Sequence, residues 1–213
     1  MTDTSRLVSE ASAQIGRMGS AFYFTEPAIS KGAELGLGTF RFYVLGRGGV
    51  LGDVDAAEVQ SAFGYFAEGI IRTQWDKART ILDPRTAALE YMACCAEFGR
   101  TKFSSLEGLE PLCAALDAVN DAADPAGLAL YAGIRAEPLA GDPPARAMQL
   151  VTVLREYRGS AHLVAIVAQL LDPKIAHFIA RPEMWNGFGY SDDEKPEVTD
   201  EHRRKLAAAN GLT

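Results

Sequence analysis

Residues 145–171, ARAMQLVTVLREYRGSAHLVAIVAQLL, decide the fold of this chain. The segment is apolar over nearly every face that a helix of about 3.6 residues per turn presents. A helix of that kind is usually buried on all sides at the centre of a domain. The sequence therefore predicts one long core helix around which the remaining elements pack.

Three basic side chains interrupt this apolar segment on one stripe. Arg155, Arg158 and His162 stand at spacings i, i+3 and i+7, which place them on the same side of a helix. Unpaired charges are costly to bury, so these side chains need partners. Either internal carboxylates pair with the arginines and lock the fold, or the stripe holds an anionic ligand through guanidinium forks and an imidazole. Both interpretations stay open at the level of sequence.

Four Asp-Pro pairs punctuate the chain, at residues 83–84, 124–125, 142–143 and 172–173. Aspartate is a favoured helix N-cap and proline a favoured first helical residue, so a helix is expected after each pair. Another capped helix is expected over residues 59–73, behind Asp55 and Glu58. Thr199 is expected to cap a last helix over residues 200–209.

The expected fold class is mainly α, a multi-helix globular bundle, because only residues 39–45 alternate as a short strand does. We expect two helical halves with winged-helix-like character. The N-terminal half, residues 1–137, contains a glycine-rich loop. A junction at residues 138–144 leads to the C-terminal half, residues 145–213, with the central helix and a polar tail.

The glycine-rich loop is expected within residues 40–53, FRFYVLGRGGVLGD. Gly46, Gly48 and Gly52 give the spacing GxGxxxG, but neither a βαβ alternation nor the Lys-Ser/Thr ending of a phosphate-binding loop accompanies it. A tight loop before a capped helix is the better interpretation. Its Arg47 is a candidate anion-binding cation among backbone amides.

Aromatic residues are dense in the first third of the chain, where they predict core packing or a pocket for a flat or apolar molecule. The candidate ligand-binding residues are Tyr43, Arg47, Arg155, Tyr157, Arg158 and His162. A metal site is not predicted, because His177 and His202 have no metal-ligand spacing with His162 and the three cysteines contain no CxxC pair. The sequence does not identify a cofactor.

The net charge of −7 disfavours DNA as a partner, because generic nucleic-acid binding rests on phosphate neutralisation by Lys and Arg. Arg203-Arg204-Lys205 is a local exception, either a basic patch or a solvated helix face. No apolar stretch approaches the roughly 20 residues of a membrane span, and residues 1–6 show no secretory signal. We expect a cytoplasmic protein, with homodimerisation left open.

Two segments resemble a group of actinobacterial proteins, the SCO-type or EvbL-like helix-turn-helix family. Residues 42–54, FYVLGRGGVLGDV, are similar to the family's YFAGRAAPLG-V segment, and residues 154–162, LREYRGSAH, to its LREHRGDGH segment. The resemblance spans about residues 15 to 190 and implies a helix-turn-helix fold and DNA binding. Tyr157, Ser160 and Ala161 replace the family's His, Asp and Gly, so no mechanism that needs that aspartate is implied. The matching positions are Gly46, Arg47, Leu51, Gly52, Arg155, Glu156, Arg158, Gly159 and His162.

Three functions remain open. The first is a small-molecule-binding helical protein, accessory or regulatory in specialised metabolism, that holds an anionic or aromatic ligand. The alternative is a winged-helix or helix-turn-helix transcription regulator that binds DNA near residues 199–209. The third is an enzyme in which His162 acts as general acid or base while an arginine holds the substrate.

Overall fold

Eleven α-helices and four short 3-10 segments make up the computed structural model, which describes residues 3–213. Met1 and Thr2, with which the expected N-terminal half begins, lie outside the described residues. The α-helices are α1 (Asp3–Met18), α2 (Glu26–Glu34), α3 (Thr39–Gly48), α4 (Ala56–Phe63), α5 (Glu68–Ala78), α6 (Pro84–Phe103), α7 (Leu109–Ala122), α8 (Ala129–Arg135), α9 (Pro143–Ala168), α10 (Pro173–Ala180) and α11 (Asp200–Asn210). The expected mainly α fold class is confirmed.

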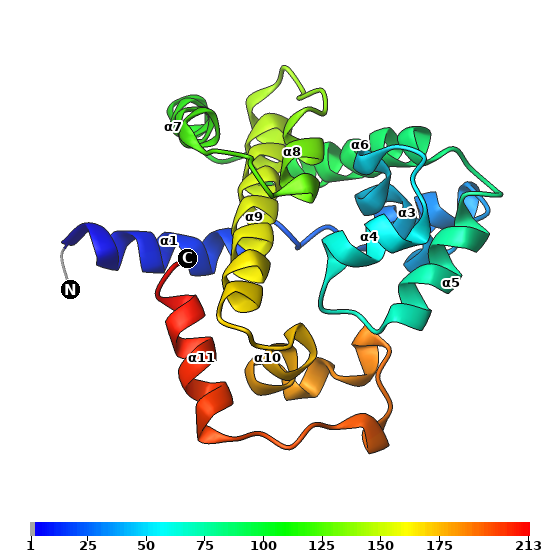
Figure 1. Cartoon of the computed structure of the whole chain (residues 1–213). Helices are drawn as coiled ribbons and strands as arrows, with labels where there is room; N and C mark the ends of the chain where they lie inside the picture. Colours follow the sequence, from blue (N-terminus) through cyan, green and yellow to red (C-terminus); the bar gives the residue numbers. More distant parts are fainter. Residues whose placement is uncertain (1–2) are drawn as a thin grey trace.

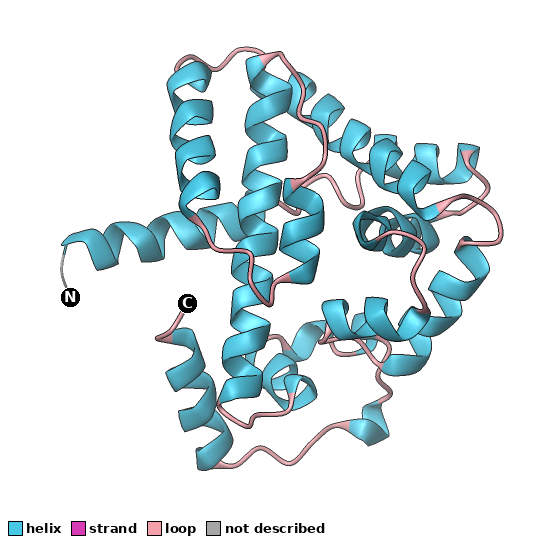
Figure 2. Ribbon diagram, turned by 45° about the horizontal axis from the view of Figure 1, so that its top comes forward, coloured by secondary structure: helices cyan, strands magenta, loops and turns pink. Residues whose placement is uncertain are grey.

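Helix α9 is the axis of the fold, as its composition predicts. It runs through the middle of the molecule and contacts α1, α6, α7, α8, α10 and α11 (Figure 1). Ala147, Met148 and Leu150 point in different directions from the axis of α9, and all three are buried. Helix α1 projects away from this core on one side (Figures 1 and 2).

The Asp-Pro pairs start helices at three of the four places. Asp83, Asp142 and Asp172 are the N-caps of α6, α9 and α10, and each side chain accepts a hydrogen bond from a backbone N–H of the first turn. Each following proline is the first residue of its helix. At the remaining pair, Asp124-Pro125, the side chain of Asp124 accepts a hydrogen bond from the N–H of Ala126 at 2.9 Å and forms a turn. Helix α8 begins only at Ala129.

The expected strand over residues 39–45 and the expected glycine-rich loop are both wrong, because these residues form α3 and a 3-10 turn, Gly49–Leu51. A short apolar run fits a buried helix as well as a strand, and no partner strand exists among residues 3–213. Gly46 lets α3 approach α6 closely, since a Cβ there stands 2.6 Å from Cβ of Tyr91. The glycine therefore serves helix packing.

Helices α4 and α5 pack against each other as a helix–turn–helix unit. Residues 64–67 join them, and Gly64 ends α4 with a φ of 47°. The expected single helix over residues 59–73 is therefore wrong, because Gly64 takes a left-handed backbone conformation that breaks it. Turns of about three to four residues, often with a glycine, are typical of such units. Tyr65 and Phe66 lie in this turn.

The C-terminal part returns to the far end of α9. After α10 the chain runs through three 3-10 segments to Thr199, whose side chain caps α11 as expected. Helix α11 then packs on α9 and α10 (Figure 2). Residues 3–213 contain no strand, so the winged-helix-like character does not include a β-hairpin wing. No single described helix has the length and apolar composition to cross a membrane; α9 and α10 qualify only as a pair bent by 118°.

Candidate ligand-binding pocket

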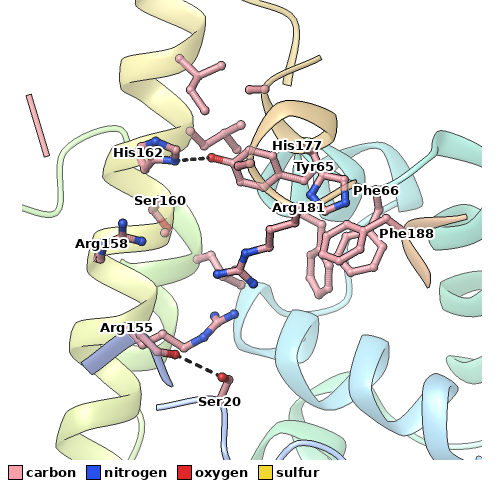
Figure 3. Close-up of a pocket in the computed structure, with 18 of the residues that line it drawn as sticks. Ser20, Tyr65, Phe66, Arg155, Arg158, Ser160, His162, His177, Arg181 and Phe188 are labelled. Carbon is pink, nitrogen blue, oxygen red and sulfur yellow. Dashed lines mark hydrogen bonds between the residues drawn. The ribbon is translucent and has the colours of Figure 1, made fainter. Parts of the chain in front are cut away.

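A cavity of about 270 Å³ lies where α9, α10, α11 and the α4–α5 turn meet. Pockets for small molecules start at about this size. Figure 3 shows Arg155, Arg158 and His162 along α9 on one side of the cavity, and Tyr65, Phe66, His177, Arg181 and Phe188 on the facing side. The polar and aromatic lining residues are Ser20, Tyr43, Arg47, Phe63, Tyr65, Phe66, Arg155, Arg158, Ser160, His162, His177, Arg181, Phe188 and Asn210.

Glu156 is fully buried behind one wall of the cavity and joins two arginines. It accepts hydrogen bonds from Arg47 Nε (3.0 Å) and Nη2 (2.8 Å), from Arg155 Nη1 (2.5 Å) and from the hydroxyl of Tyr23 (2.9 Å). Arg47 also donates to the hydroxyl of Tyr43 at 3.2 Å. Burial alone raises the pKa of Glu156, but the charges of Arg47 and Arg155 outweigh it and lower this pKa to about 2. One ionised carboxylate therefore faces two guanidinium groups.

Two further arginines, Arg158 and Arg181, line the cavity without a protein partner. Neither guanidinium forms a hydrogen bond or an ion pair with any residue in the described range 3–213. Both side chains are exposed, and Figure 3 shows them on opposite sides of the pocket. No Asp or Glu is among the described lining residues, although the whole chain carries a net charge of −7. The pocket is thus a local cationic site in an acidic protein.

A hydrogen-bonded chain crosses the pocket from the α4–α5 turn to α11. The hydroxyl of Tyr65 lies 2.9 Å from Nδ1 of His162, and Nε2 of His162 lies 2.8 Å from Oδ1 of Asn210. Because Asn210 Oδ1 only accepts, Nε2 of His162 carries the proton and Tyr65 donates to Nδ1. Burial lowers the pKa of His162, the bond to Asn210 opposes this, and the charge of Arg158 lowers the pKa further. The imidazole is therefore neutral near pH 7.

The opposite wall is aromatic. The rings of Phe66 and Phe188 stack with centroids 4.1 Å apart and an interplanar angle of 17°. His177 lies 4.0 Å from Phe188 and is buried, and its Nε2 has no hydrogen-bond partner in the described chain. Burial, and next the charge of Arg181, lower the pKa of His177. Phe66 and His177 both pack against Phe188, so this wall of the cavity is aromatic and apolar.

The structure brings five of the six candidate residues to one cavity. Tyr43 and Arg47 come from α3, while Arg155, Arg158 and His162 come from α9. The sixth, Tyr157, lies outside the pocket lining, because it points from α9 toward Tyr131, with ring centroids 5.0 Å apart.

Arg181, Phe188 and Asn210 are among the pocket residues that were not identified from the sequence, whereas Tyr65 belongs to the aromatic residues for which a pocket was one interpretation. They lie in turns or at helix ends, where no periodic pattern marks a buried or functional face. Glu156 lies within the segment 154–162, yet its role as the partner of Arg47 depends on a contact between two residues that are 109 positions apart in the sequence. The only sequence signal was the need of Arg155 for a counter-charge.

A comparison with protein-family models gives one match, to a family described as a helix-turn-helix family, over residues 8–210. No curated protein and no solved structure matches the chain significantly.

Proposed function

The chain belongs to this helix-turn-helix family, and from that premise we propose that it binds a small anionic ligand with an aromatic ring in the arginine-lined pocket. An accessory or regulatory role in specialised metabolism is part of the same proposal. The single observation that carries it is the unpartnered pair Arg158 and Arg181 in a lining without carboxylates among the described residues.

The charge balance of the pocket favours an anion. Arg47 and Arg155 share Glu156, whereas Arg158 and Arg181 have no counter-charge among the described residues. Four guanidinium groups and one carboxylate leave an excess of three positive charges around the cavity. A guanidinium binds a carboxylate or a phosphate through two parallel N–H donors, so a bound anion gains strong, oriented hydrogen bonds here.

The aromatic wall favours a flat group on the same ligand. Phe66 and Phe188 line the cavity, and aromatic rings gain from edge-to-face or stacked contact with another ring. The cavity volume of about 270 Å³ suits a ligand with a single ring. Benzoate combines one ring with one carboxylate and is the simplest probe of this class.

The experiment measures thermal stabilisation and calorimetric affinity with benzoate and with benzamide, its neutral analogue of the same shape. We expect benzoate to raise the melting temperature and benzamide to leave it unchanged, because ligand binding to the native state stabilises it. Arg158→Gln and Arg181→Gln each weaken benzoate binding about tenfold, since each removes one charged hydrogen-bonding partner. Arg204→Gln, on the exposed face of α11, is the matched control and leaves binding unchanged. Equal effects of benzoate and benzamide contradict the proposal.

The second candidate is a DNA-binding regulator, which the family and the α4–α5 unit favour. The exposed face of α5 carries Glu68, Arg72, Asp76 and Lys77, so its charges cancel. Arg203 and Arg204 on α11 are exposed and supply a small basic surface. This candidate predicts salt-dependent binding to the promoter of the protein's own gene. The absence of any shift with that promoter at low salt contradicts it.

A further inference from the structure

We propose that the pocket also carries out a reaction, in which Tyr65 removes a proton from the carbon next to the carbonyl group of a bound 2-oxo acid and His162 takes up the proton that Tyr65 releases. The proposal rests on the anion binding proposed above. It adds an activity, a catalytic residue and a substrate class to that site.

The geometry supplies the proton path. The hydroxyl of Tyr65 donates to Nδ1 of His162 at 2.9 Å, so the lone pairs of the phenol oxygen remain free to accept a second proton. Asn210 holds the opposite nitrogen, Nε2, in its protonated form at 2.8 Å. The tautomer that leaves Nδ1 as the acceptor is thereby fixed. Tyr65 is itself one of the residues that line the cavity.

The charges around this pair favour the build-up of negative charge. Burial raises the pKa of the Tyr65 hydroxyl, and the charges of Arg158 on α9 and Arg181 at the end of α10 offset part of this rise. The other groups that face the pair are His177 on α10 and Asn210 on α11, and neither is anionic. An enolate formed in the pocket therefore meets guanidinium groups and no carboxylate among the described lining residues.

The step balances without a further reactant. The C–H bond of the ligand breaks and its electron pair moves into the enolate. The proton joins the phenol oxygen of Tyr65 as the original Tyr65 proton moves to Nδ1 of His162. Return of the protons along the same path, to carbon or to the enolate oxygen, completes a keto–enol interconversion and restores both side chains.

The substrate class follows from the same groups. A carboxylate suits Arg158 and Arg181, and an aromatic ring suits Phe66 and Phe188. A ketone between them makes the neighbouring C–H acidic enough for a tyrosine–histidine pair. Phenylpyruvate carries all three features and is the probe.

The experiment follows hydrogen–deuterium exchange at C3 of phenylpyruvate by NMR in D₂O, while calorimetry measures its binding. We expect the protein to accelerate exchange about 100-fold or more over buffer, the usual contribution of a positioned acid–base group. Tyr65→Phe and His162→Gln each reduce this acceleration at least about tenfold when the exchange is measured at a phenylpyruvate concentration that saturates the variant in calorimetry. Tyr157→Phe, a matched change outside the pocket, retains the wild-type rate.

The pH profile separates a proton relay from a merely structural role of His162. The wild-type rate falls as the pH drops through the His162 pKa, because a protonated imidazole accepts no proton from Tyr65. His162→Gln removes this dependence.

Two outcomes overturn the proposal while the binding proposal stands: phenylpyruvate binds but exchanges at the buffer rate, or Tyr65→Phe exchanges at the wild-type rate. Failure of both benzoate and phenylpyruvate to bind instead overturns the proposed function itself, and this activity with it.

Discussion

Arg47 on α3 and Glu156 on α9 are joined by two hydrogen bonds, Nε to Oε1 at 3.0 Å and Nη2 to Oε2 at 2.8 Å. This pair of hydrogen bonds links α3 to the central helix α9 between residues 109 positions apart in the sequence. The same carboxylate distinguishes two arginines of the basic stripe on α9, Arg155 and Arg158. Arg155 has an internal carboxylate, as the structural interpretation requires, whereas Arg158 has no partner in the described chain, as the ligand interpretation requires.

Replacement of Glu156 by Gln is expected to destabilise the protein by about 3–5 kcal/mol, because it leaves the buried charges of Arg47 and Arg155 without a counter-charge. Urea unfolding of both proteins at pH 7 measures the difference. Glu97→Gln is the control, since its ion pair with Arg100 is exposed on both sides and its loss costs less than about 1 kcal/mol. Equal stabilities of Glu156→Gln and Glu97→Gln contradict the structural role of Glu156.

Acid is expected to remove the contribution of Glu156 to stability. Its pKa is about 2 in the folded protein, below the ordinary value of 4.5 that a glutamate has in the unfolded chain. Because the folded pKa is the lower one, the unfolded state binds the proton first, and the stabilisation is complete above pH 4.5 and lost as the pH falls toward 2. The difference between the folded and unfolded pKa of Glu156 corresponds to about 3 kcal/mol of folding free energy. Urea midpoints between pH 7 and pH 3 measure the loss, and the dependence is expected to be shallower in Glu156→Gln. If stability falls with pH in the same way in the wild type and in Glu156→Gln, protonation of Glu156 is not the cause of the loss.

Much of the fold could be predicted because its signals are local. Asp83, Asp142 and Asp172 cap helices through contacts with residues two or three positions ahead. The composition of residues 145–171 sufficed to place α9 at the centre. Helix α3 could not be identified, because its short apolar run fits a strand as well, and the role of Gly46 depends on Tyr91 in another helix.

The candidate site could be predicted only along α9 and at Arg47. The stripe of Arg155, Arg158 and His162 follows from helical spacing alone. Tyr65, Arg181 and Asn210 reach the same cavity from a turn and two helix ends, through packing that no single segment encodes.

The three cysteines are expected to be unreactive in the native protein. Burial raises the pKa of Cys95 to about 12 and that of Cys94 to about 11, and it also raises the pKa of Cys113. All three side chains are buried, so little thiolate is present or accessible at pH 8. A chromogenic disulfide reagent is expected to titrate all three in urea and, over the same minutes, none in buffer. Rapid modification of even one native thiol conflicts with this packing.

Gly64 is expected to be the most sensitive glycine of the α4–α5 unit. It has a φ of 47°, and a Cβ there meets the side chain of Leu163, which lines the pocket. Gly64→Ala is therefore expected to cost about 1–3 kcal/mol through backbone strain and displacement of Leu163, and to weaken benzoate binding. Gly69→Ala is the matched control at the second residue of α5, where an added Cβ has no atom within 4 Å and alanine has the higher helix propensity. Thermal unfolding and benzoate calorimetry on both variants separate the two effects. If Gly64→Ala gains stability as Gly69→Ala does, neither the positive φ of Gly64 nor its close approach to Leu163 constrains this turn.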